Sequence, residues 1–116
     1  MKQEFRKYRN KVIVNAFGKF DSIKEWKRYI YLLDLQKRSK IKNLRRQVRY
    51  EIIPKQVDNQ GKVIERACHY VADFVYEREG KTIVEDVKSA ITSPIATFTI
   101  KRKLMLFVHG IRINEV

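Results

Sequence analysis

The chain is 116 residues long, which is enough for one small domain, residues 1–116, and too short for two separate cores. Its hydrophobic share of 44% and aromatic share of 11% exclude a disordered basic chain. No apolar run approaches the ~20 residues of a membrane span and none follows the first charged residues as in a signal peptide, so we expect a cytoplasmic protein.

Basic residues are concentrated in the first half of the chain. The formal net charge is +13; residues 1–50 hold 16 Lys and Arg against 4 Asp and Glu, whereas residues 51–116 hold 10 against 9. This asymmetry favours a polyanion-binding surface beside a separate acidic site. Nucleic acid is the preferred polyanion over a membrane, because no amphipathic basic helix stands apart from the core. The alternative is that the charge serves solubility alone.

The N-terminal region is predicted to hold a tail, a small hairpin and a helix. Residues 1–11 form a basic tail that is either solvated or follows a phosphate backbone. Val12 to Phe17 is a short β-like run, and a turn at Gly18-Lys19 predicts a hairpin. Apolar residues at helical spacing then predict a helix from Ser22 to Lys37.

Glu25 has two interpretations within that helix. Ser22 is a good N-cap, and a glutamate three residues later completes a capping box that satisfies a backbone N–H. Alternatively, the side chain points from the first turn toward the centre of the molecule and serves a metal site. One carboxylate cannot fully serve both roles.

The most basic segment follows the helix. Ser39 to Arg49 is interpreted either as a phosphate-contacting segment or as a solvated linker. Val48 to Pro54 is predicted as a strand from its β-branched residues, and Asp58 to Gly61 as a turn. The candidate phosphate contacts here are Lys40, Lys42, Arg45, Arg46, Gln47 and Arg49.

A β-hairpin is the centre of the predicted fold. Ala67 to Tyr76 alternates and is rich in Val, Tyr and Phe, Glu79 to Lys81 forms the turn, and Thr82 to Lys88 returns as the second strand. Within the first strand, Asp73 stands alone among apolar residues.

Two acids and a lysine are predicted to converge on this hairpin. Asp86 and Lys88 are two residues apart, so on a strand they share a face at a spacing of about 7 Å. If Asp73 faces them across the ladder, two carboxylates and an ammonium meet at one point. Glu85 points to the opposite face and is excluded from the site.

The C-terminal region completes the predicted fold. Ser93 and Pro94 mark a second helix, whose basic face carries Lys101, Arg102 and Lys103 and which ends at Gly110. Ile111 to Val116 alternates as a last strand. The order helix, three strands, helix, strand predicts a mixed α/β domain with a central sheet flanked by helices.

No other catalytic set is visible. The 4 glycines are scattered, so there is no phosphate-binding loop. His69 and His109 lack metal-ligand spacing, although His69 alternates with Asp73 and lies either near the site or simply within a strand. The one cysteine, Cys68, excludes an internal disulfide and is predicted to be a small core residue.

The order of a helical glutamate, an aspartate on one strand, Asp-x-Lys on the next and a basic helix resembles the PD-(D/E)XK nuclease superfamily. The chain more closely resembles a small phage-encoded family within it, of unknown function and similar to phage Holliday junction resolvases. This resemblance rests on the phrases FDSIKEWKRY, NLRRQVRYEIIPKQ, YVADFVYEREGKTIVEDVKS and TFTIKRKLMLF. Two departures are Ala72, where the superfamily has its proline, and Ser89, where a glycine is common.

The resemblance implies a restriction-endonuclease-like core and Mg²⁺-dependent hydrolysis of DNA phosphodiesters, with Mn²⁺ as a substitute. It assigns the metal to Asp73, Asp86, the backbone carbonyl of Val87, and Glu25. Lys88 would position the attacking water, and Gln47 would contact the substrate. It also implies branched DNA as the substrate, a homodimer that makes two symmetric cuts, and action in the bacterial host cytoplasm.

Two alternatives stay open. In the first, the protein is a non-catalytic basic DNA- or RNA-binding protein whose acids are structural. In the second, it is a nuclease of the same fold that cuts at chosen sequences or at transposon ends.

Overall fold

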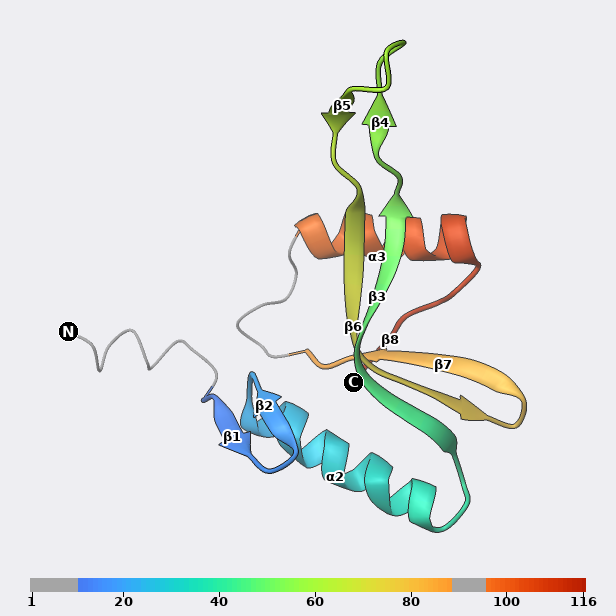
Figure 1. The fold of residues 1–116 in the computed structure, drawn as a ribbon. Helices are drawn as coiled ribbons and strands as arrows, with labels where there is room; N and C mark the ends of the chain where they lie inside the picture. Colours follow the sequence, from blue (N-terminus) through green and yellow to red (C-terminus); the bar gives the residue numbers. More distant parts are fainter. Residues whose placement is uncertain (1–10, 89–95) are drawn as a thin grey trace, which may run out of the picture.

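A four-stranded mixed sheet forms the centre of the computed structural model, which describes residues 11–88 and 96–116. Its strand order is β3-β6-β7-β8, from β3 (Lys42–Ile53), β6 (Cys68–Arg78), β7 (Lys81–Asp86) and β8 (Asn114–Glu115). The first three strands are antiparallel, whereas β8 runs parallel to β7. Figure 1 shows β3 and β6 as the two long strands that link the parts of the molecule. The predicted α/β class is therefore confirmed.

Two helices and two small sheets surround this sheet. They are α2 (Ile23–Lys37), α3 (Ala96–His109), the pair β1 (Ile13–Asn15) and β2 (Gly18–Phe20), and the pair β4 (Gln56–Val57) and β5 (Val63–Glu65). In Figure 1, the β4–β5 hairpin projects from the ends of β3 and β6, and β1–β2 lies beside the start of α2. Neither helix of the described chain has the length and apolarity that crossing a membrane requires.

Each helix covers its own hydrophobic cluster. The α3 cluster is built around Met105, which is fully buried, and extends over the sheet. The α2 cluster is built around Leu32 and Phe74, which are also fully buried. Burial of this kind contributes about 25 cal/mol per Å² of apolar surface and holds both helices on the strands. The buried members are Ile52, Tyr70, Ala72, Val75, Val84, Met105 and Ile113 in the α3 cluster and Leu32, Leu35, Ile41, Phe74 and Tyr76 in the α2 cluster.

Strand β6 changes its alternation at Asp73. Phe74 belongs to the α2 cluster and its neighbour Val75 to the α3 cluster, so the two clusters lie on opposite faces there. Ala72 belongs to the α3 cluster, although a regular strand would place it on the same face as Phe74. The alternation therefore breaks between Ala72 and Phe74, and Asp73 is the residue at the break.

Strand β3 changes face at the matching position. Val48 packs against the α3 cluster and Leu44 against the α2 cluster, although the two are an even number of residues apart. Between them, Gln47 has a φ of 51°, the left-handed conformation that breaks a strand's alternation. Its neighbours pair with residues 74 and 72, so Gln47 lies opposite Asp73.

Three predicted boundaries need correction. The segment from Lys42 to Arg49 is not a linker but the first part of β3, which continues to Ile53, so the predicted strand from Val48 to Pro54 covers only its second part. The turn of the first hairpin lies at Ala16-Phe17, and Gly18 already belongs to β2. The last strand is limited to Asn114–Glu115 instead of starting at Ile111.

A further boundary differs: the second strand of the central hairpin, predicted to reach Lys88, is β7 and ends at Asp86, so Lys88 lies beyond the strand. The other elements described here follow their predictions. Ser22 is the N-cap of α2, which ends at Lys37, and the hairpin turn falls at Glu79-Gly80. Gly110 ends α3 with a φ of 67°, and its N–H donates to the Leu106 carbonyl, as in a helix end with a left-handed glycine. The predicted start of this helix at Ser93-Pro94 and the tail over residues 1–10 lie outside the described residues.

Candidate active site

Three carboxylates from three elements lie around the point where β3 and β6 change face. Glu25 comes from the first turn of α2, Asp73 from the middle of β6, and Asp86 from the last position of β7. The charges of Glu25 and Asp86 both act on Asp73 and disfavour its ionised form. The structure thus brings together the acids that the sequence singled out.

The two carboxylate oxygens of Glu25 have different partners. Its backbone N–H donates to Ser22 Oγ over 3.0 Å, and its Oε1 accepts from the backbone N–H of Asp21 over 3.0 Å. The carboxylate of Glu25 therefore accepts from the residue before the N-cap, Asp21, and not from Ser22 as in a standard capping box. Oε2 turns to β3, where Gln47 Nε2 lies 3.2 Å away. The side chain is buried, and burial is the main reason why its pKa is raised.

Asp73 is anchored by the end of β7. Its Oδ2 accepts from the backbone N–H of Val87 over 2.8 Å, and its Oδ1 lies 3.3 Å from Gln47 Nε2. Burial raises the pKa of Asp73 to about 7, the Val87 bond opposes this shift, and the Glu25 and Asp86 charges add to it. The predicted role of Val87 involves its carbonyl; the contact found here involves its N–H.

Asp86 and Lys88 form an ion pair. Lys88 Nζ lies 2.8 Å from Asp86 Oδ2 and 2.9 Å from the centre of the Phe98 ring on α3. The hydroxyl of Tyr70 donates to Asp86 Oδ1 over 3.0 Å, and burial raises the pKa of this tyrosine, so it stays protonated. Tyr70 and Phe98 were not predicted as site residues, because a strand tyrosine and a helix phenylalanine read as core.

The donor set suits a hard cation, but the acids do not form a cage. Carboxylate oxygens are the ligands that Mg²⁺ prefers. Within residues 11–88 and 96–116, however, no three His, Cys, Asp or Glu side chains are grouped so that they hold a metal ion. Two of the acids instead have separate partners: Asp73 accepts from the backbone N–H of Val87, and Asp86 forms an ion pair with Lys88. The acids thus offer the ligand type that Mg²⁺ prefers, carboxylate oxygens, without being grouped as a cage in the described residues.

Glu85 faces α2, on the opposite side of β7 from its neighbour Asp86. Its carboxylate is 2% exposed and accepts from Arg28 over 2.6 and 2.9 Å and from the Tyr76 hydroxyl over 2.5 Å. Arg28 comes from α2, so this pair joins the helix to the sheet. The exclusion of Glu85 from the site agrees with these partners.

Arg46 faces inward, unlike the other candidate phosphate contacts on β3. Its guanidinium carbon lies 3.7 Å from the centre of the Phe20 ring, and Nη2 lies 3.6 Å from Glu25 Oε2. Nη2 also donates to the Lys19 carbonyl over 2.5 Å. A Cβ at Gly18 would come within 3.0 Å of Nη1, so glycine leaves room for this side chain. Arg46 thus fastens the β1–β2 hairpin to α2 and β3.

The other candidate phosphate contacts are at or near the surface. Lys40, Lys42, Arg45, Gln47, Arg49 and Lys103 are exposed, and Lys101 and Arg102 are partly so. Arg49 lies 3.1 Å from His69 Nδ1, and Arg102 lies 3.7 Å from Glu115.

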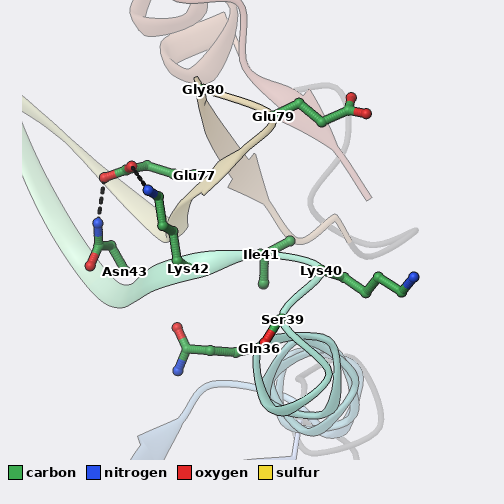
Figure 2. Close-up of a pocket in the computed structure, with 9 residues that line it drawn as sticks. All are labelled: Gln36, Ser39, Lys40, Ile41, Lys42, Asn43, Glu77, Glu79 and Gly80. Atoms are coloured by element: carbon green, nitrogen blue, oxygen red, sulfur yellow. Dashed lines mark hydrogen bonds and ion pairs between the residues drawn. The ribbon is translucent and has the colours of Figure 1, made fainter.

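An open pocket lies between the end of α2, the start of β3 and the β6–β7 turn. In Figure 2, Lys42 and Asn43 reach toward Glu77, whereas Lys40 extends away from them. The distances are 3.9 Å for Lys42 to Glu77 and 2.6 Å for Asn43 to Glu77. The lining includes none of the three site acids; it consists of Gln36, Ser39, Lys40, Ile41, Lys42, Asn43, Glu77, Glu79 and Gly80.

Comparison with known proteins relates the chain to a sequence family. No curated protein and no solved structure matches it significantly. One family model matches residues 5–111, which is nearly the whole chain, and this family is described as "Protein of unknown function (DUF1064)". The protein belongs to this family.

Proposed function

We propose that this protein is a metal-dependent endodeoxyribonuclease that hydrolyses phosphodiesters in branched DNA, as Holliday junction resolvases do. The proposal includes a restriction-endonuclease-like core within the observed α/β fold. One observation carries it: Asp73 is surrounded by the charges of Glu25 and Asp86, with Lys88 paired to Asp86. Carboxylates that repel one another beside an ammonium are the arrangement expected of a site for a cation and a phosphate.

The site residues have distinct roles in this proposal. Asp73 and Asp86 would hold Mg²⁺ or Mn²⁺, with Glu25 and the Val87 carbonyl as further ligands. When bound, the cation would polarise the phosphate and lower the pKa of an attacking water. Lys88 would offset the negative charge that develops on the phosphate, and Phe98 and Asp86 hold its ammonium close to the site.

The DNA is expected to lie across the exposed basic residues of β3 and α3. Arg45 and Arg49 on β3 and Lys103 on α3 are exposed, so their charges are available to phosphates. We further propose a homodimer, because two symmetric cuts in a four-way junction need two sites, and action in the host cytoplasm.

Cleavage assays on four-way, flap and linear DNA test the function. Wild-type protein is expected to cut the branched substrates with Mg²⁺ or Mn²⁺ and not with EDTA. Asp86→Asn should abolish cutting, whereas Glu77→Gln, a control near the end of β6 where the side chain contacts Lys42 and Asn43 and none of the three acids, should cut normally. Sequence-dependent cutting of the linear DNA would favour a sequence-directed or transposon-end nuclease.

A non-catalytic nucleic-acid-binding protein is the second candidate. It is favoured by the individual donors of the acids: Val87 for Asp73, Lys88 for Asp86 and Asp21 for Glu25. Acids that only stabilise the fold would have such partners. Wild-type protein that binds branched DNA but cuts none of the substrates with either metal would establish this alternative.

A further inference from the structure

Two residues inside strand β3 have a left-handed backbone. Among the described residues other than glycine, φ is positive at Ser39, Asn43, Gln47 and Glu79. Ser39 and Glu79 lie in turns, where this conformation is common. Asn43 and Gln47 lie within the strand, where an extended backbone is expected.

Gln47 is the less expected of the two. Asparagine is several-fold enriched at positive φ, because its short side chain bonds locally, whereas glutamine is not. Such a conformation costs on the order of 1–3 kcal/mol and persists where the surroundings require it, often at functional sites. The side chain at position 47 therefore has a use that a glycine or asparagine would not serve.

The amide of Gln47 bridges two of the site acids. Its Nε2 lies 3.2 Å from Glu25 Oε2 and 3.3 Å from Asp73 Oδ1. A side-chain amide has two N–H donors, so it can serve both oxygens at once. One acid is on α2 and the other on β6, and the change of face at Gln47 directs this side chain to them.

We propose that Gln47 is a positioning residue that holds the Glu25 and Asp73 carboxylates in place while the cation site is empty. The inference deepens the proposed function and rests on its metal site. It also replaces the expected role of Gln47 as a DNA contact, because both bonds of the amide go to the acids.

The bridge has a predictable relation to a cation. The amide dipole partly offsets the repulsion between two carboxylates that are close together. A divalent cation offsets this repulsion far more strongly and stabilises the folded state as any specific ligand does. Loss of the amide should therefore make stability more dependent on the cation.

Gln47→Gly and Asn43→Gly form a matched pair for the test. Both positions have positive φ, which glycine adopts without strain, so the backbone effect is the same in both variants. Melting temperatures are measured in EDTA and in Mg²⁺. We expect the Mg²⁺-induced rise to be larger in Gln47→Gly than in wild type and unchanged in Asn43→Gly. Affinity for branched DNA in EDTA should not fall in Gln47→Gly.

Two results would overturn the proposal. If Mg²⁺ raises the melting temperature of wild type and of Gln47→Gly by the same non-zero amount, the residue has a structural role only. A loss of DNA affinity in EDTA together with an unchanged Mg²⁺ response would mean that Gln47 contacts the DNA instead.

A double-mutant cycle with Asp73→Asn in EDTA separates this inference from the proposed function. If wild type shows no Mg²⁺ response and no cleavage but the cycle is non-additive, the nuclease fails and the bridge stands. Additive effects at Gln47 and Asp73 would exclude the bridge itself.

Discussion

The backbone N–H of Val87 donates to the carboxylate of Asp73 over 2.8 Å. This bond joins the middle of β6 to the residue between Asp86 and Lys88, so the acid of one strand is positioned by the end of the next. Because the donor is a backbone N–H, it is kept in every side-chain variant of Val87 other than proline.

Asp86→Asn separates catalysis from binding. The new amide oxygen can still accept from Tyr70, and repulsion with Asp73 is relieved, whereas the largely buried ion pair with Lys88 is lost; these effects oppose one another, so we expect the variant to fold. Cleavage of branched DNA should fall by several orders of magnitude, because a charge that holds the cation is lost. DNA affinity in EDTA should stay equal or rise. A variant that still cuts would place the catalytic centre elsewhere.

Asp73 should make the protein less stable at higher pH in the absence of metal. Its pKa is about 7 in the folded state against 3.8 as a model value, so between these values the folded protein keeps a proton that the unfolded chain has released. The free energy of unfolding attributable to this group therefore falls as pH rises from about 4 through 7. Asp73→Asn should flatten this part of the profile and raise stability at alkaline pH by roughly 1–3 kcal/mol.

Urea unfolding of both proteins at several pH values in EDTA measures this difference. Parallel profiles for wild type and Asp73→Asn would mean that Asp73 is not buried among like charges. Glu77→Gln, which removes an acid elsewhere on β6, is the control.

Charge reversal should have different effects at the neighbouring residues Arg45 and Arg46. Arg45 is exposed, so Arg45→Glu should reduce the slope of log affinity against log salt by about 1–2 while leaving the fold intact. Arg46→Glu would place a second carboxylate beside Glu25 and leave the Lys19 carbonyl without its donor, so it should destabilise the protein. Thermal melts measure the stability of the two variants, and salt titrations measure their DNA binding. An equal loss of slope in two well-folded variants would mean that Arg45 and Arg46 have the same role.

Substitution of Glu85 should reduce stability, whereas substitution of its neighbour Asp86 should reduce cleavage. Glu85→Ala leaves Arg28 and the Tyr76 hydroxyl without their partner in a buried place, so we expect a loss of several kcal/mol in stability. Below its melting temperature, the variant should still cut branched DNA, since Glu85 faces away from the site. Loss of cleavage without loss of stability at Glu85 would mean that the site extends through the sheet.

Elements that depend on local chemistry can be predicted from the residues alone. Ser22 and Glu25 mark the start of α2, because an N-cap and its reciprocal acid act within one turn. The hairpin of β6 and β7 follows from alternation and the glycine at its turn, and it carries Asp73 and Asp86 at the predicted positions. These signals need no information from distant parts of the chain.

The conformation of the basic segment depends on contacts with distant parts of the chain. Lys42 to Arg49 reads as a solvated or phosphate-binding stretch, yet it is a strand, because β6 supplies its hydrogen bonds and α2 and α3 cover it. Arg46 has the same local chemistry as Arg45 but is turned inward to Phe20 and Glu25, contacts that exist only after α2 has packed. The change of face at Gln47 and Asp73 is likewise invisible in the pattern, since it arises from fitting two helices to opposite faces of one pair of strands.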